Sequence, residues 1–326
     1  MISVILNSFN QKKYIRKSIE SVLSQSFDNF ELIINDNAST DGTVEILKEF
    51  ESINKIKIIY NEKNENIGKR LNESIKISNG EFISFLYSDD FYQKDKLSFQ
   101  FELIKKLSKN YGLVYGPGYF FNDQGLKKIK KVPKIKKNSL IEMLSQTETS
   151  IDMISPLFRK SCFQNIKFLE NIFAEGEAII FRIACDYEVF YHDKILVNHR
   201  VTNENRGKAI IKNYHMSKVS LFMIKEHFLY KQKVIKKKIN NYFAQNALRT
   251  SWGNLRANGS KLQSLKLYRE ALEFSFKTIL NFRSFLIIIS ILIPKFVLRH
   301  LNNFFNRKGL AKNVILKNYG GSDIKN

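Results

Sequence analysis

The sequence predicts an α/β protein that contains a mostly parallel sheet with helices on both faces, followed by a C-terminal helical region. In the first hundred residues, short β-branched runs alternate with amphipathic stretches, which is typical of strand–helix–strand units. After about Tyr214 the strand patterns stop and only helical patterns follow. Apolar residues make up 44% of the 326 residues, which is enough to form a packed core.

The first expected elements follow one another in strand–helix order. Strands are expected at Ser3–Leu6, Phe30–Ile34, Lys55–Tyr60 and Glu81–Tyr87. Helices are expected between them, at Tyr14–Leu23, Thr43–Phe50 and Ile67–Ile77. Parallel sheets bind ligands at the carboxyl ends of their strands, so chemistry is expected in the turns after Leu6, Ile34 and Leu86.

The pattern loosens from about Leu97. A helix is expected first, then a strand region and a lysine-dense loop or hairpin, at Leu97–Lys109, Gly112–Phe121 and Gly125–Asn138. Three short segments continue the α/β layout, at Ser155–Arg159, Glu177–Cys185 and Glu188–Tyr191. The helical region that follows is expected to contain Met216–Phe228, Lys233–Asn254 and Ser260–Thr278.

Charge and cysteine usage narrow the function classes. Lys and Arg number 53 against 31 Asp and Glu, a net charge of 53 − 31 = +22, which favours anionic partners. No recognisable nucleic-acid-reading module accompanies this charge, so nucleic acid is not an expected partner. The two cysteines, Cys162 and Cys185, are too few for a disulfide framework. With no expected secretory signal, they predict a cytoplasmic protein.

Asp36 directly follows the second expected strand. A carboxylate in this place can accept hydrogen bonds from a nucleobase or ribose at the sheet edge. The alternative is a capping role for the next helix, which Ser39, Thr40 and Asp41 could also fill. We assign the cap to Asp41 and the ligand contact to Asp36.

Asp89 and Asp90 follow the fourth expected strand. Two adjacent carboxylates repel each other unless a cation lies beside them. Mg²⁺ and Mn²⁺ take carboxylate and phosphate oxygens together, so a divalent ion that holds a diphosphate fits this pair. The alternative is a solvated turn.

The order of these motifs resembles that of family 2 glycosyltransferases. The resemblance rests on Ser3–Asn10, Ser21–Phe27, Asp36–Thr43 and Gly80–Ile83 leading into Asp89-Asp90, and it extends from about Ile2 to Asn205. It implies the GT-A fold, a Rossmann-like α/β fold, and inverting transfer from a nucleotide-sugar. It also implies a divalent metal, Mn²⁺ or Mg²⁺, as cofactor.

The resemblance assigns the nucleotide and metal contacts. Base binding falls on Ser8, Phe9 and Asp36, although Asn37 and Ala38 depart from the family pattern of a second acid and a glycine. The family metal motif reads Asp-x-Asp. Tyr87 stands at its first position here, which leaves Asp89 and Asp90 as the expected metal ligands.

The catalytic residues are assigned in the same way. Asp152 resembles a family carboxylate that faces the sugar or acceptor, with a surface carboxylate as the alternative. The family base stands six residues before an Arg, but counting back from Arg182 leads to Gly176, which cannot accept a proton. The neighbouring Glu175 and Glu177 are therefore the candidate bases, or catalysis is impaired.

Basic residues supply further candidates for the nucleotide. Lys69 and Arg70 stand at an expected helix start, where they could reach a phosphate or be solvated. Arg200 and Arg206 lie in a segment that resembles one closing over the diphosphate in the family. His199 is expected to be structural rather than a metal ligand.

Two segments indicate a membrane surface. Phe285–Pro294 is uncharged but shorter than the roughly 20 apolar residues that span a bilayer. Because basic residues flank it, it is expected to rest on an anionic membrane, with a buried helix as the alternative. Lys127–Lys137 is expected to form a hairpin with an exposed lysine face, which could engage anionic lipid or an acidic lipid-linked acceptor, or simply be solvated.

These observations predict a chain of four parts. Residues 1–214 form the GT-A domain, with a nucleotide-binding half at 1–95 and an acceptor half at 96–214. A helical region at 215–280, an amphipathic helix at 281–308 and a tail at 309–326 follow.

The predicted function is inverting transfer of a sugar, with a UDP-sugar as the first candidate donor. The acceptor is a glycan or a lipid-linked molecule in bacterial surface-polysaccharide synthesis. The enzyme is expected at the inner face of the plasma membrane, attached peripherally. A sugar-nucleotide-binding scaffold without catalysis is the alternative.

Overall fold

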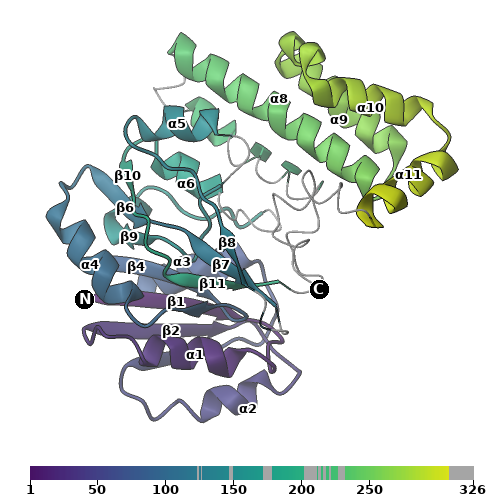
Figure 1. Cartoon of the computed structure of the whole chain (residues 1–326). Helices are drawn as coiled ribbons and strands as arrows, with labels where there is room; N and C mark the ends of the chain where they lie inside the picture. Colours follow the sequence, from purple (N-terminus) through teal and green to yellow (C-terminus); the bar gives the residue numbers. More distant parts are fainter. Residues whose placement is uncertain are drawn as a thin grey trace. The chain divides into compact units, whose positions relative to one another are not determined.

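The computed structural model describes residues 1–122, 125, 127–146, 150–171, 178–201, 211, 214–215, 218–219, 222–226 and 232–307. The chain divides into two units, Met1–Glu142 with Ser150–Arg200 and Met143–Thr149 with Val201–Asn326. The first unit holds both sheets, and the second is helical where it is described (Figure 1).

A seven-stranded sheet, in the order β10-β6-β9-β4-β1-β2-β3, organises the first unit. Its strands are β1 Ile2–Ser8, β2 Phe30–Asp36, β3 Ile56–Tyr60, β4 Phe82–Tyr87, β6 Tyr111–Tyr115, β9 Leu157–Arg159 and β10 Glu188–Tyr191. The helices between them include α1 Ile15–Leu23, α2 Thr43–Lys48, α3 Ile67–Ile77 and α4 Lys96–Lys106. Strands β1 to β4 pair in parallel, which confirms the predicted alternation. Strand β9 runs antiparallel to both β4 and β6.

A four-stranded sheet, in the order β5-β11-β7-β8, stands beside the first in the same unit. Its strands are β5 Phe91–Tyr92, β7 Gly118–Phe121, β8 Lys127–Lys130 and β11 Val197–Arg200. The strand region predicted at Gly112–Phe121 contains two strands, β6 and β7, which belong to different sheets. Pro117 lies between them and has no N–H to donate to a ladder, so pairing is interrupted there.

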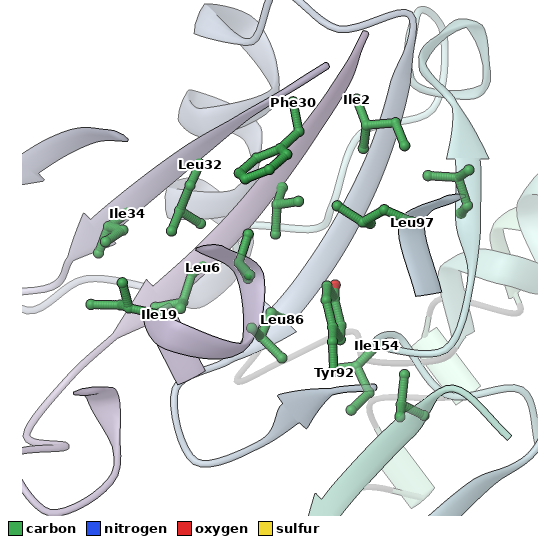
Figure 2. Packing of buried hydrophobic residues seen from close by; sticks show 14 of the residues in the cluster. Ile2, Leu6, Ile19, Phe30, Leu32, Ile34, Leu86, Tyr92, Leu97 and Ile154 are labelled. Carbon is green, nitrogen blue, oxygen red and sulfur yellow. The ribbon is translucent and has the colours of Figure 1, made fainter. Parts of the chain in front are cut away.

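Apolar side chains of the large sheet pack against α1 and α4. Ile2, Val4 and Leu6 of β1 are fully buried with Ile19 of α1 and Leu97 of α4. Figure 2 shows part of this cluster, in which Leu6 of β1, Leu32 of β2 and Leu86 of β4 lie with Ile19 of α1 and Leu97 of α4. Strand β1 is buried on both faces, and for that reason its sequence is mostly apolar from Ile2 to Leu6.

The described helices of the second unit pack around a core of their own. They are α8 Lys233–Arg256, α9 Lys261–Phe274, η5 Phe276–Leu280, α10 Phe282–Leu292 and α11 Lys295–Arg307. Leu248, Trp252 and Leu255 of α8 meet Leu267 of α9 and Ile287 of α10 in this core. None of the helices in the described ranges combines the length and apolar character that crossing a bilayer requires.

The helix predicted at 281–308 is two helices. Ile293 is extended, with φ −71° and ψ 148°, and Pro294 begins the next turn. Proline disfavours the helical conformation in the residue before it, which ends α10 at Leu292. The remaining helical segments of the chain are α5 Ser139–Ser145, η1 Lys160–Phe163, α6 Ala178–Ile183 and η3 Met223–Glu226.

A fully buried lysine begins α4. Lys96 Nζ donates to Ser84 Oγ at 2.8 Å and to Gln100 Oε1 at 2.9 Å. Burial lowers the pKa of Lys96 from 10.5 to about 7, although the charge of Asp152 acts in the opposite direction. His192, which contacts Gln100, has a pKa lowered to about 4 by burial and by the charge of Lys96.

We expect replacement of Lys96 by methionine to flatten the pH dependence of stability. The folded pKa lies below the unfolded one, so the unfolded chain binds more protons between pH 7 and 10.5. The free energy of unfolding of the wild type should therefore rise with pH across this window. The difference between a pKa of 10.5 and one of about 7 corresponds to roughly 5 kcal/mol. Denaturant titrations at several pH values measure the slope, and Lys106→Met, an exposed position on α4, is the control. Equal slopes in wild type and Lys96→Met would contradict the expectation.

Candidate active site

The carboxyl ends of β1, β2 and β4 lie at one edge of the large sheet. Ser8 pairs in register with Asp36, and Asn7 pairs with Tyr87. Because β1 separates β2 from β4, the ends of these two strands lie about 10 Å apart, twice the spacing of neighbouring strands. A ligand that contacts both Asp36 and the turn after β4 must therefore extend across β1.

Asp36 is buried at the end of β2. Its Oδ2 accepts a hydrogen bond from the backbone N–H of Ser39 at 2.9 Å, and its Oδ1 accepts from Ser39 Oγ at 2.6 Å. Each carboxylate oxygen keeps further acceptor capacity, so this turn orients Asp36 without exhausting it. Asp41 Oδ1 accepts from the N–H of Thr43, the first residue of α2, at 3.0 Å, whereas the N-cap position itself is held by Gly42.

Two polar side chains beside Asp36 lack partners. Among the residues that the structure describes, the Asn7 amide and the Ser8 hydroxyl are buried without a hydrogen bond. Each buried polar group left in this state costs about 1–3 kcal/mol. A polar ligand at the sheet edge would recover this cost. Ser8 was predicted, whereas Asn7 was missed, although a polar residue that ends an apolar strand is a readable signal. Phe9 follows and is half-buried.

The turn after β4 holds Asp89 and Asp90. The N–H of Asp90 donates to the carbonyl oxygen of Tyr87 at 3.0 Å, which closes the turn. Ser18 of α1 clamps it, since its Oγ lies 2.9 Å from the carbonyl oxygen of Ser88 and 2.6 Å from that of Asp90. Burial, together with the charge of Asp89, raises the pKa of Asp90 well above its usual value.

Arg200, the last residue of β11, is tied to the same turn. Its backbone N–H donates to Asp90 Oδ1 at 2.7 Å, and its Nε donates to the carbonyl oxygen of Asp89 at 3.0 Å. The guanidinium stacks on Tyr14 and Phe121, with ring centroids at 4.2 and 4.6 Å. A stacked guanidinium has restricted freedom, so Arg200 is held at the paired acids.

Asp152 lies in a buried charged cluster with Lys130 and His199. Its Oδ2 lies 3.0 Å from Lys130 Nζ and 3.3 Å from His199 Nε2, and its Oδ1 accepts from the N–H groups of Ile154 and Ser155. His199 Nδ1 lies 3.9 Å from Asp90 Oδ2, which connects this cluster to the paired acids.

The environment of Asp152 makes it a weak base. Burial alone would raise its pKa, but the charges of Lys130 and His199 outweigh burial and hold the pKa far below the usual range. A general base works best when its pKa lies near the working pH. This favours an electrostatic role for Asp152 over proton abstraction.

Lys130 was not singled out from the sequence. In the segment predicted to expose a lysine face, Lys131, Lys134, Lys136 and Lys137 are exposed. Lys130 differs, because only 15% of its side chain is exposed, while the neighbouring Ile129 is exposed. Alternate residues of a strand point to opposite faces, and the carboxylate of Asp152 compensates the charge of the inward lysine. His199 was predicted to be structural, and its link between Asp152 and Asp90 could be found only from the fold.

Lys69 and Arg70, at the start of α3, contact residues of the loops that follow β2 and β3. Lys69 forms an exposed ion pair with Glu65 at 2.6 Å. Arg70 is buried and donates to Asn37 Oδ1 at 2.8 Å and to the carbonyl oxygen of Lys63 at 2.7 Å. These bonds hold the loop after β2, which favours a positioning role for Arg70. The phosphate contact of either residue stays a prediction.

The candidate bases Glu175 and Glu177 lie outside the described residues. Arg182, from which their positions were counted, is on α6 and donates to the carbonyl oxygen of Lys167. Arg206 also lies outside the described residues.

Fold and side chains together define an α/β protein whose candidate ligand site lies at the carboxyl edge of a parallel sheet. A family model described as "Glycosyl transferase family 2" matches residues 3–186, more than half of the chain. The chain belongs to glycosyl transferase family 2, as its motifs predicted.

The curated relatives include two bacterial glycosyltransferases whose names state a role in glycan synthesis. The putative teichuronic acid biosynthesis glycosyltransferase TuaG of Bacillus subtilis is 39% identical over 109 residues, which are 33% of this chain and 43% of TuaG. WfgD of Escherichia coli, a UDP-Glc:alpha-D-GlcNAc-diphosphoundecaprenol beta-1,3-glucosyltransferase, is 34% identical over 126 residues, 39% of this chain and 49% of WfgD. The chain thus spans less than half the length of each of these two relatives.

Solved structures confirm the predicted GT-A fold. TarS 1–349 of S. aureus, in complex with UDP-GlcNAc, has a TM-score of 0.57 at 17% identity and covers 85% of this chain and 91% of its own. The mannosyltransferase PcManGT of Pyrobaculum calidifontis, in complex with GDP-Man and Mn²⁺, has a TM-score of 0.60 at 12% identity. The match covers 99% of this chain and 88% of PcManGT.

Proposed function

We propose that this chain transfers a sugar, with inversion, from a UDP-sugar to a glycan or lipid-linked acceptor in bacterial surface-polysaccharide synthesis. The observation that carries the proposal is the set of polar groups at one sheet edge. Asn7 and Ser8 of β1 have no hydrogen-bond partner and lie beside Asp36 of β2, and the paired acids follow β4, the other neighbour of β1. The complex of TarS with UDP-GlcNAc supports a uridine donor, and the undecaprenol-linked acceptor of WfgD supports a lipid-linked one. Such an acceptor implies a peripheral position at the inner face of the plasma membrane.

Asp89 and Asp90 fit a divalent cation, Mn²⁺ or Mg²⁺. In the described residues no group of three or more acidic, His or Cys side chains could hold a metal alone. Two carboxylates completed by diphosphate oxygens are the usual arrangement for such ions at phosphate substrates. When bound, the cation would neutralise the charge that develops on the departing diphosphate. Arg200, held at the same turn, would add positive charge there.

In the proposed reaction, an acceptor hydroxyl attacks the anomeric carbon from the face opposite the diphosphate. The new carbon–oxygen bond forms as the bond to the diphosphate breaks, and the configuration inverts. A carboxylate removes the hydroxyl proton, a contribution of about 10²–10⁴-fold. Glu175 and Glu177 are the candidates for this role, and the ionised Asp152 would orient the sugar or acceptor.

The proposal is tested with a panel of UDP-, GDP- and dTDP-sugars, with and without Mn²⁺. We expect a Mn²⁺-dependent thermal shift with one nucleotide class and release of that nucleotide when acceptor is present. Asp36→Asn should weaken binding of this donor about ten-fold, because a charged acceptor is lost at the base. The control is Asp41→Asn, which lies in the same loop but contacts Thr43 at the start of α2. Binding of no donor would overturn the proposal.

A second candidate is a sugar-nucleotide-binding scaffold, favoured by Gly176 at the position of the family base. Glu175→Gln and Glu177→Gln separate the two candidates. An enzyme should lose most of its transfer activity in one of these variants while donor binding persists. A scaffold would bind the donor and turn over in none of the proteins, wild type included.

A further inference from the structure

The second unit exposes apolar side chains on three consecutive elements, η5, α10 and α11. Exposed fractions run from 58% to 86% for the residues that we call the apolar face, namely Phe276, Leu280, Phe282, Phe285, Leu292 and Phe296. Phe282 and Phe285 stack with ring centroids 6.4 Å apart. Isolated exposed apolar residues are ordinary, but a contiguous group marks an interaction surface.

Helix α10 exposes large apolar side chains and buries small polar ones. Its buried positions include Ser284 and Ser290, whereas Phe282, Phe285 and Leu292 are exposed. A water-exposed helix normally buries its apolar stripe and exposes its polar one. The exposed stripe of α10 therefore fits an apolar partner. On its buried side, Ile287 joins the core with Trp252, and Leu286 and Ile291 pack against that core.

The charged residues of the segment that carries the apolar face are all basic, with Glu273 just before it. Residues 274–322 contain no Asp or Glu, and the basic residues within η5, α10 and α11 are Lys277, Arg283, Lys295, Arg299 and Arg307. Lys277 and Arg299 have exposed side chains. Anionic lipid headgroups attract such residues at the membrane surface. A second copy of this face would instead meet like charges, because a two-fold interface pairs identical surfaces.

The helices are too short to cross a bilayer. Helix α10 has 11 residues, about 16 Å at 1.5 Å per residue, against a hydrocarbon core of about 30 Å. Pro294 separates it from α11, so the two cannot join into one span. An apolar stripe with flanking basic residues in this length range lies in the plane of the interface.

We propose that the apolar face inserts its aromatic and leucine side chains into the headgroup–acyl boundary of an anionic bilayer, with Lys277 and Arg299 on the headgroups. This proposal rests on the proposed function. It names the surface that would hold the enzyme near a lipid-linked acceptor.

The test is co-sedimentation of the full chain with phosphatidylcholine vesicles that contain or lack phosphatidylglycerol. We expect binding only to the anionic vesicles. The triple variant Phe282→Ser/Leu292→Ser/Phe296→Ser should bind at least ten-fold more weakly. It lacks three large apolar side chains whose transfer from water into the bilayer would favour binding. Lys277→Glu/Arg299→Glu should weaken it as strongly, and more so at low salt.

Single substitutions provide a matched control. Phe296→Ser should weaken vesicle binding severalfold. Val234→Ser should not, because Val234, although 58% exposed, lies in the first turn of α8 and is not part of the apolar face. Wild-type-like binding by the triple variant would overturn the proposal. So would a triple variant that turns an oligomer into a monomer and leaves vesicle binding unchanged, because the face would then bind a second copy.

Donor binding in the absence of vesicles separates this proposal from the proposed function. If the protein shows its Mn²⁺-dependent donor shift but ignores anionic vesicles, only the membrane surface is wrong. If it binds the vesicles through the apolar face but no nucleotide-sugar stabilises it, only the proposed function is wrong.

Discussion

Replacing Asp90 by asparagine is expected to lower kcat for sugar transfer at least about 100-fold. The diphosphate gains charge as it departs, and interactions aimed at such developing charge contribute roughly 10²–10³-fold each. Asp90 is buried at the turn that Arg200 and Ser18 hold together, so no other side chain can easily take its place. An amide carries no charge and is a poorer ligand for Mn²⁺ or Mg²⁺.

The loss should come from chemistry and not from unfolding. Asparagine has nearly the same shape, and its Oδ1 can still accept the N–H of Arg200. Steady-state assays over a range of Mn²⁺ concentrations, together with thermal melts, measure both effects. Asp28→Asn, at an exposed ion pair with Lys55, serves as the control and should change kcat less than about two-fold. A fully active Asp90→Asn protein would refute the assignment of the paired acids.

The second large effect is expected for Phe85→Ala, which should cost about 3–5 kcal/mol of stability. Phe85 of β4 is 1% exposed. The centroid of its ring lies 5.6, 5.8 and 5.6 Å from the ring centroids of Phe158, Phe163 and Phe168, and all three contacts are edge-on. Truncation leaves a cavity on the strand that leads directly to Asp89 and Asp90, so bound donor should be held less firmly as well.

Chemical denaturation followed by circular dichroism measures this cost. Trp252, the single tryptophan, belongs to the second unit, so its fluorescence separates the unfolding of that unit from the rest. Phe296→Ala removes a ring that is 75% exposed and should change stability by less than about 0.5 kcal/mol. A loss below 1 kcal/mol for Phe85→Ala would show that the surrounding rings close the cavity.

The first four strands of the large sheet were predictable because their patterns are local. A parallel strand buried on both faces reads as an unbroken apolar run, and the polar residues that end it mark the ligand edge. Asp36, Asp89 and Asp90 were chosen as candidates in this way, and their ligand contacts stay predictions. Strand β5 was missed because Phe91–Tyr92 is too short to carry a pattern, and its partner β11 lies a hundred residues later.

The break at Pro294 was readable but was not used. Proline disfavours helix in the residue before it, and that rule alone divides 281–308 into two helices. The apolar run around it was correctly distinguished from a membrane span by its length. Which of its residues face outward depends on how α10 meets α8 and α9, which local periodicity does not show.

Sequence by itself determined the family, the alternation of strands and helices in the first hundred residues and the acids that follow the strands, since each depends on short stretches of neighbouring residues. Tertiary structure alone decided that Lys130, Asp152 and His199 form one buried cluster beside Asp90. The reason is physical. A buried charge is stable only when opposite charges or hydrogen bonds compensate it, and these partners come from strands that lie far apart in the chain.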